Sequence, residues 1–158
     1  NRYNYKLFNE FYENNITSFS ISLASASSIT DDDVKLSERL FIPSRRLRGF
    51  ETGKVGPKDG DDFIGGNYSA TFNAQSNIPG IFQNFQNLDA VMFFDAASLW
   101  GVDYDSAIDD GAKLRSSIGI GVDWYTAIGP LNFTLSEVIT KEDNDITESF
   151  RFNLGTTF

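Results

Sequence analysis

Apolar and polar residues alternate with a period of two along much of this chain, which is the pattern of β-strands with one apolar face. The clearest run lies between Leu114 and Thr126, where the even-numbered positions are mostly apolar and the odd-numbered positions are small or polar. An amphipathic helix would mix these two sets across its faces. Similar patterns predict about seven strands, over residues 2–12, 18–23, 67–75, 88–99, 114–126, 131–136 and 150–158.

The alternation predicts an all-β fold, and its details favour an antiparallel transmembrane β-barrel. Most of the predicted strands approach the ten or so residues that a tilted strand needs to cross a bilayer. Short and long connections alternate along the chain, as the two rims of an outer-membrane barrel require. A soluble β-sandwich shows the same alternation and stays open as an alternative. An open sheet of seven strands would leave unpaired edges in lipid, so the chain is either part of a larger barrel or contains an eighth strand.

Composition excludes several classes of function. The chain has 158 residues, a formal net charge of −9, no Cys and no His. The acidic balance argues against a nucleic-acid partner, which needs a basic surface. The absence of Cys and His removes disulfides, Ser-His-Asp catalysis and nearly every zinc enzyme, so we expect no catalytic residues, no metal and no cofactor. The N-terminal residues do not form a signal peptide, which suggests a removed signal or an internal fragment.

A long segment without periodicity, at about residues 30–64, interrupts the strands, and a segment of this length is usually functional or disordered. Its acidic runs, at residues 31–33 and 58–62, do not have the spacing of a calcium loop and are typical of solvated loop tips. Between them, residues 42–50 gather three Arg residues beside Gly49 and Phe50. By itself this cluster is also typical of a basic surface turn.

Several motifs together resemble the BamA-type family of outer-membrane barrel insertases, which also includes two-partner secretion transporters. The resemblance covers about residues 38–158. Its motifs, in chain order, are Arg48-Gly49-Phe50, Gly56-Pro57, Gly65-Gly66-Asn67, Phe93-Phe94-Asp95 with Trp100, Gly119-Ile120-Gly121 with Trp124, Ile128-Gly129-Pro130-Leu131, and Phe150-Arg151-Phe152-Asn153-Leu154-Gly155 with Phe158. Arg-Gly-Phe alone is a weak signal, whereas its order and spacing with the later motifs are specific.

The resemblance implies that residues 1–158 are the C-terminal portion of a sixteen-stranded barrel preceded by POTRA domains. It also implies that the segment at about 30–64 is an external loop that folds back into the barrel lumen. The alternation places Asp95 on the lumen side, if Met92 and Phe94 face lipid. We therefore expect Arg48 to form a bidentate ion pair with Asp95. The family commonly has a Glu that makes a second ionic contact, but Gln75 stands at that position here.

The last strand is the second candidate site. Phe150, Phe152 and Phe158 resemble the C-terminal aromatic signal by which barrel proteins are recognised for assembly, although lipid-facing anchors would look the same. In the family this strand pairs weakly with the first strand of the barrel, and opening that seam admits nascent strands. Gly155 would weaken packing in the strand, consistent with a strained seam.

The resemblance implies a non-enzymatic function: assembly and insertion of β-barrel proteins into the bacterial outer membrane. Its partners would be unfolded outer-membrane proteins, outer-membrane lipid and accessory lipoproteins. The alternatives are a polypeptide transporter of the same family and a stand-alone small barrel acting as a pore or adhesin. An outer-membrane enzyme is the least favoured interpretation, since the usual His is missing.

Overall fold

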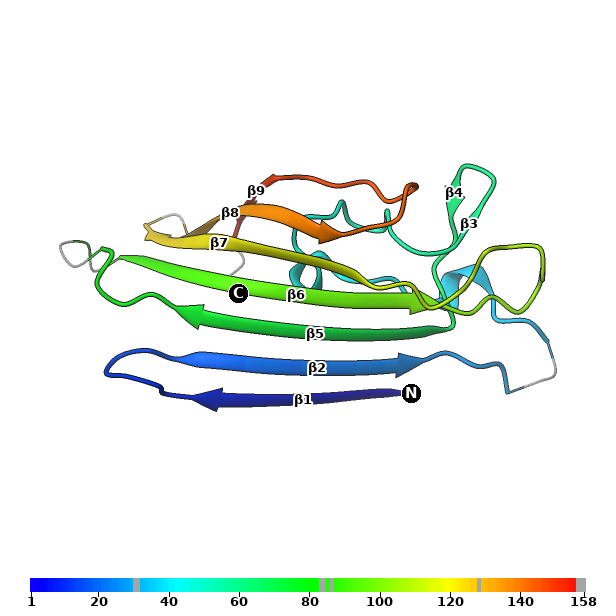
Figure 1. Ribbon diagram of the computed structural model, residues 1–158, viewed down its shortest axis with the longest axis horizontal. Coiled ribbons are helices and arrows are strands. Elements are labelled where there is room, and N and C mark those ends of the chain that lie inside the picture. The colour runs from blue at the N-terminus through cyan, green and yellow to red at the C-terminus, as the bar shows by residue number, and fades with distance from the viewer. Residues whose placement is uncertain (30–31, 83–84, 86, 128, 156–158) are drawn as a thin grey trace.

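The computed structural model describes residues 1–29, 32–82, 85, 87–127 and 129–155, and it contains one extended antiparallel sheet. Seven strands form this sheet in the order β1-β2-β5-β6-β7-β8-β9 (Figure 1). They are β1 (Arg2–Asn9), β2 (Thr17–Ser25), β5 (Tyr68–Asn77), β6 (Leu88–Trp100), β7 (Arg115–Thr126), β8 (Gly129–Thr140) and β9 (Phe150–Leu154). The prediction of an all-β, seven-stranded antiparallel sheet is confirmed. A β-sandwich needs two packed sheets, and the described residues add only one two-stranded hairpin to this sheet.

The connections between neighbouring strands alternate between the two ends of the sheet. The connections β1–β2, β5–β6 and β7–β8 lie at one end, on the left in Figure 1. The connections β2–β5, β6–β7 and β8–β9 lie at the other end, and the first two of these are the longest of the six. The β2–β5 connection contains two short 3₁₀ helices, η1 (Leu36–Glu38) and η2 (Ser44–Arg46), and the hairpin β3 (Lys58–Asp59) and β4 (Asp62–Phe63). These elements have no periodic signal because each is only two or three residues long.

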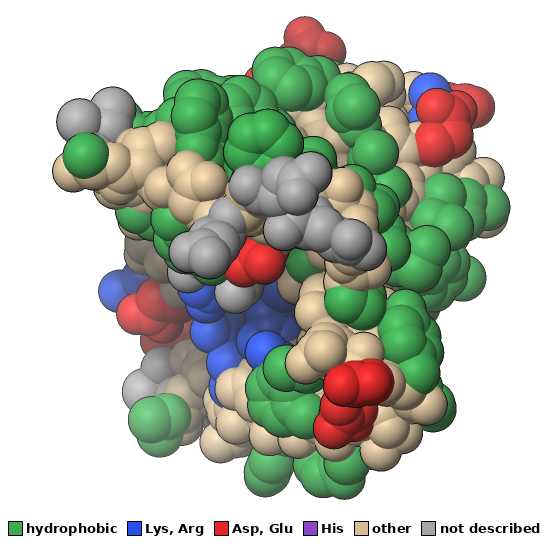
Figure 2. Space-filling view, turned by 90° about the vertical axis from the view of Figure 1, so that its left-hand side faces the viewer, with side chains coloured by type: hydrophobic (Ala, Val, Ile, Leu, Met, Phe, Trp, Pro, Cys, Tyr) green, Lys and Arg blue, Asp and Glu red, His purple; other side chains and the backbone are tan. Residues whose placement is uncertain are grey.

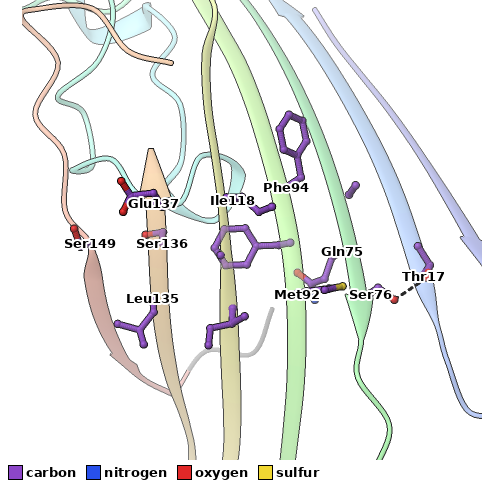
Figure 3. Close-up of a pocket in the computed structure, with 14 residues that line it drawn as sticks. Thr17, Gln75, Ser76, Met92, Phe94, Ile118, Leu135, Ser136, Glu137 and Ser149 are labelled. Carbon is purple, nitrogen blue, oxygen red and sulfur yellow. Dashed lines mark hydrogen bonds between the residues drawn. The ribbon is translucent and has the colours of Figure 1, made fainter. Parts of the chain in front are cut away.

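The sheet is curved, and its two faces have opposite chemistry. The outer face carries large exposed apolar side chains, including Met92, Ile118 and Leu135, and Figure 3 shows them around an open hollow with Phe94. Polar side chains are buried on the inner face. Seen from the end that carries the β1–β2, β5–β6 and β7–β8 connections, hydrophobic groups cover much of the outside, while Lys and Arg groups lie within the hollow (Figure 2). This is the arrangement predicted for strands with hydrocarbon outside and a polar lumen inside.

Among the residues that the structure describes, no helix is long and apolar enough to cross a membrane.

All seven strands differ by at least one residue from their predicted ranges, and the structure gives a reason for three of them. β1 ends at Asn9 because the chain turns just afterwards, with Asn14 at φ +62°. β8 continues to Thr140, beyond the regular alternation, because a register shift at Ser116/Ser117 of β7 accommodates an extra residue. β9 ends at Leu154, so its predicted continuation to residue 158 is wrong at residue 155 and otherwise lies outside the described residues.

The buried apolar core lies on the inner face, between the sheet and the β2–β5 connection. Its buried members are Ile42, Leu47, Phe50, Val55, Ala97 and Leu99. Four of them come from the connection and two come from β6, so the sheet does not bury a core with a second sheet. The connection itself fills the concave side of the sheet, which fixes its position relative to the strands.

Candidate functional site

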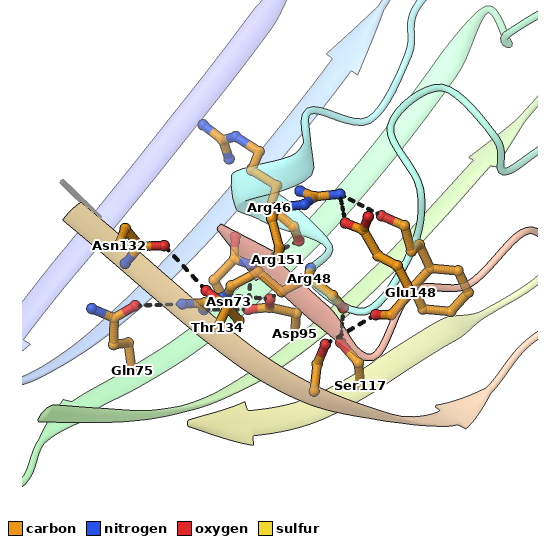
Figure 4. A network of polar contacts seen from close by, with 12 residues as sticks. Arg46, Arg48, Asn73, Gln75, Asp95, Ser117, Asn132, Thr134, Glu148 and Arg151 are labelled. Carbon is orange, nitrogen blue, oxygen red and sulfur yellow. Dashed lines mark hydrogen bonds and ion pairs between the residues drawn. The ribbon is translucent and has the colours of Figure 1, made fainter. Parts of the chain in front are cut away.

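The site is centred on the segment from Arg46 to Phe50, which we call the motif loop. It begins at the last residue of η2 and lies over the inner faces of β5, β6 and β7 (Figure 4). Leu47 and Phe50 point into the apolar core, each with at most 2 % of its surface exposed. The Arg48 side chain between them points away from that core, toward Asp95 on the strand wall.

Arg48 and Asp95 of β6 form a buried bidentate ion pair. Arg48 Nε donates to Asp95 Oδ2 at 2.7 Å and Arg48 Nη2 donates to Oδ1 at 2.7 Å. The backbone N–H of Arg48 also donates to Oδ2, at 3.0 Å. The two side chains are 4 % and 0 % exposed. The structure therefore places the predicted partners together, in the planar fork geometry that distinguishes Arg from Lys.

Three neighbours complete the surroundings of this pair. Arg48 Nη1 donates to Gln75 Oε1 at 2.8 Å, so an amide oxygen accepts the contact for which the family commonly has a carboxylate. Asn73 lies opposite Asp95 in the β5–β6 register and donates to Asp95 Oδ1 at 2.8 Å. The guanidinium carbon of Arg48 lies 3.6 Å from the centroid of the Phe93 ring, a cation–π contact. Sequence reasoning missed Asn73, although counting the register across from Asp95 would have found it.

Gly49 brings the loop backbone against β7 and β8. Its φ is +90°, and a Cβ there would lie 3.2–3.3 Å from side chains of Ser117, Ser136 and Val138. The Ser117 hydroxyl donates to the carbonyl oxygen of Arg48. A side chain at this position would therefore meet both backbone strain and close neighbours.

Gly119 of β7 provides the room that Phe93 needs. A Cβ at Gly119 would overlap the Phe93 ring and the backbone oxygen of Leu135. The absence of a side chain lets Phe93 lie flat against β7, which in turn offers its ring face to Arg48. This close approach gives a physical reason for the first glycine of the Gly-Ile-Gly motif.

Residues 49–54 also form a short antiparallel ribbon with residues 146–148 of the β8–β9 connection. An isolated antiparallel bridge joins Phe50 and Thr147. The backbone hydrogen bonds run from Glu148 N to Gly49 O at 3.0 Å, from Glu51 N to Ile146 O at 2.9 Å and from Ile146 N to Lys54 O at 3.1 Å. The sequence gives no signal for this pairing, because it joins two irregular segments almost one hundred residues apart.

A second buried ion pair, Arg115–Asp145, holds the same connection and was not predicted. Arg115 Nε donates to Asp145 Oδ2 at 2.9 Å and Nη2 donates to Oδ1 at 3.1 Å. The side chains are 4 % and 1 % exposed. Arg115 lies on the inward face of β7, two residues from Ser117. This position on the inner face was the signal in the sequence that Arg115 needs a buried partner. The pair anchors the connection that reaches the motif loop.

The far part of the β2–β5 connection is tied to the β6–β7 connection through Arg39 and Asp103. Arg39 Nη2 lies 3.3 Å from Asp103 Oδ1, and the Val34 N–H donates to Oδ2 at 2.8 Å. Burial alone would raise the pKa of the Asp103 carboxyl. Hydrogen bonds from Val34 and the Asn67 side chain, together with the charge of Arg39, outweigh burial and hold that pKa below its ordinary value.

The predicted residues of the last strand lie away from the motif loop. Phe150 and Phe152 point outward and are 55 % and 50 % exposed, and Phe152 contacts Phe133 of β8 with 5.2 Å between ring centroids. Gly155 follows the end of β9 with φ +82°. Phe158 lies outside the described residues. Within the described part of the chain, no group of three or more acidic side chains could hold a metal ion.

Comparison with known proteins agrees with this geometry. A family model described as the Omp85 superfamily domain matches residues 1–158. The outer membrane protein assembly factor BamA of Neorickettsia risticii (strain Illinois) is 25 % identical over 151 residues, which cover 94 % of this chain and 20 % of that protein. The BamA of Neisseria meningitidis serogroup B (strain ATCC BAA-335 / MC58) is 31 % identical over 140 residues, covering 71 % of this chain and 17 % of that protein.

A solved structure shares the fold. The crystal structure of BamA from Haemophilus ducreyi lacking POTRA domains 1–3 superposes with a TM-score of 0.82 and 25 % identity, over 94 % of this chain and 33 % of that chain. The present chain thus spans about a fifth of the curated relatives and a third of the solved one. Because the family model matches the chain from end to end, the chain belongs to the Omp85 superfamily of bacterial outer-membrane β-barrel proteins.

Proposed function

We propose that the protein containing this chain inserts and assembles β-barrel proteins in the bacterial outer membrane, without catalytic chemistry, nucleotide or metal. The observation that carries the proposal is the motif loop, with Arg48 buried against Asp95 inside a sheet that matches the BamA barrel. The named relatives are outer membrane protein assembly factors. Unfolded outer-membrane proteins would be the substrates, with outer-membrane lipid and accessory lipoproteins as partners.

The proposed mechanism uses edge pairing. Among the described residues, β9 is paired with β8 over five residues and is an end strand of the sheet. In the whole barrel its other edge would face the first strand, and opening of that seam would present backbone donors and acceptors on which an incoming strand can form its own hydrogen bonds. The outward Phe150 and Phe152 would lie against lipid at that edge. The motif loop would hold the barrel wall in shape while the edge accepts the substrate strand.

The test uses the full-length protein in lipid vesicles, with a urea-unfolded outer-membrane barrel protein as substrate. Asp95→Asn should slow substrate folding, because the loop loses its main contact with the wall, whereas Asp103→Asn should have a much smaller effect. The heat-modifiable gel mobility of each variant shows whether its own barrel has folded. A folded Asp95→Asn protein that inserts substrate at the unmodified rate would contradict the proposed role of the loop. Export of a soluble polypeptide, without barrel insertion, would favour the transporter alternative.

A further inference from the structure

β9 has few attachments to the rest of the barrel. Within the described part of the chain, its ladder with β8 covers five residues, whereas β8 pairs with β7 over eleven. Its outward side chains are exposed, and its inward positions are the polar residues Arg151 and Asn153. No apolar side chain of the described strand therefore enters the buried core. The strand needs some other contact to hold its inner face in place.

Arg151 makes that contact with the motif loop. Its Nη2 donates to the carbonyl oxygen of Phe50 at 2.8 Å. Among the described residues of β9, this is the only side-chain hydrogen bond to the loop. Arg151 also forms an ion pair with Glu148, three residues earlier (Figure 4). The Arg151 side chain is 16 % exposed, so the contact is largely shielded from water.

Two positions of the motif loop, its middle and its C-terminal end, are thus held by different parts of the barrel. Arg48 is fixed to Asp95 on β6, and two residues later the Phe50 carbonyl is fixed to Arg151 on β9. Only Gly49 separates Arg48 from Phe50, and an extended chain spans at most about 3.6 Å per residue, so a large displacement of the Arg48 backbone must also displace the Phe50 carbonyl. A charge-assisted hydrogen bond weakens steeply as its geometry is lost.

We propose that Arg151 is a positioning residue that couples the motif loop to the last strand, so that release of Arg48 from Asp95 frees β9. Seated, the loop holds β9 against β8 through the Phe50 carbonyl. Unseated, it leaves β9 with its short ladder and the outward Phe152–Phe133 contact, and the edge opens more often. The coupling between the motif loop and β9 is a structural claim. Only its consequence, control of the edge that receives substrate, rests on the proposed function. The contact itself stands on the geometry alone.

Hydrogen exchange of the full-length protein in membranes tests the coupling, read on peptides that cover residues 148–155. Arg151→Met should exchange about tenfold faster in β9, the effect expected from loss of one charge-assisted hydrogen bond. Arg151→Lys, which can still donate to a carbonyl, should restore most of the protection. Glu148→Gln is the matched control, because it removes the ion pair but leaves the Phe50 contact, and it should stay within about twofold of the unmodified protein.

A double substitution separates coupling from simple loss of stability. Arg48→Met should also raise exchange in β9, and Arg48→Met with Arg151→Met should raise it no further, because both changes break the same connection. The proposal would be overturned if exchange in β9 rose in the double variant by the product of the two single fold-increases. So would unchanged β9 exchange in a folded Arg151→Met protein. Arg151→Gln, which removes the charge and shortens the side chain, serves as the second variant should Arg151→Met fail to fold.

Substrate insertion is measured on the same variants, so that the two proposals can fail separately. Faster β9 exchange with unchanged insertion would leave the coupling intact and contradict the use of this edge by substrate. Slower insertion with unchanged β9 exchange would overturn the coupling and leave the proposed function standing. Concerted changes in both readouts, restored together by Arg151→Lys, are the expected result.

Discussion

Replacing Asp95 by Asn is the sharpest perturbation of the motif loop, because it preserves shape and removes charge. The two oxygens of Asp95 accept three hydrogen bonds from Arg48, of 2.7, 2.7 and 3.0 Å. An Asn side chain has one oxygen and one amide group, so at least one Arg48 donor would face another donor. The guanidinium would remain buried without its counter-charge.

The expected loss follows from the burial of the pair. Exposed ion pairs contribute at most about 1 kcal/mol, but removing one partner of a buried pair costs about 3–5 kcal/mol. The exposures of 4 % and 0 % place Arg48 and Asp95 in the buried class. Arg48 keeps its contacts with Gln75 and the Phe93 ring, which moderate the loss. We expect Asp95→Asn to lower the free energy of unfolding by about 3 kcal/mol.

A double-mutant cycle with Arg48→Met isolates the pair itself. Unfolding by urea in lipid vesicles, followed by gel mobility, gives the free energy of each variant. We expect a coupling energy above about 1.5 kcal/mol, because each single change leaves the other group buried without its partner. The Arg39–Asp103 pair is the control on the same connection: its carboxylate is 32 % exposed, and its coupling should stay below about 1 kcal/mol. A coupling below about 0.5 kcal/mol at Arg48–Asp95 would refute the reasoning.

Three further predictions test other parts of the structure. Gly119→Ala should destabilise the barrel by about 1–3 kcal/mol in urea unfolding, because its Cβ would overlap atoms of β6 and β8; an unchanged midpoint would contradict the close approach. Ile120→Lys should cost about 2–4 kcal/mol on the outer face, whereas Ser20→Lys on the inner face should cost much less; equal losses would reverse the face assignment. The pKa of Asp103 lies below its ordinary 3.8, so its contact with Arg39 stabilises the connection above that pH and is lost as the pH falls through the lowered value. Proteolysis of residues 34–40 should therefore accelerate below about pH 4 in the unmodified protein but change less in Asp103→Asn, and equal pH profiles would contradict it.

The sequence by itself determined the strands, their faces and the chemistry of the lumen. Alternation is a local property, because successive side chains of a strand point to opposite faces of the sheet. Ile118 and Ile120 must therefore share one face, and Ser117 must lie on the other. The same count placed Asp95 inward. One face of each strand meets hydrocarbon and the other meets water and polar groups. The two faces could therefore be assigned without knowing which strands pair with each other. The match of motif spacing then related Arg48 to Asp95 across the fold.

Only the tertiary structure decided what surrounds the motif loop. The ribbon between residues 49–54 and 146–148, the ion pair of Arg115 with Asp145 and the contact of Arg151 with Phe50 all join segments without periodicity. Their partners depend on how far the sheet curves and on which connections share one end of it. Neither quantity is encoded in any local run of residues, because both arise from the packing of the whole sheet around its contents.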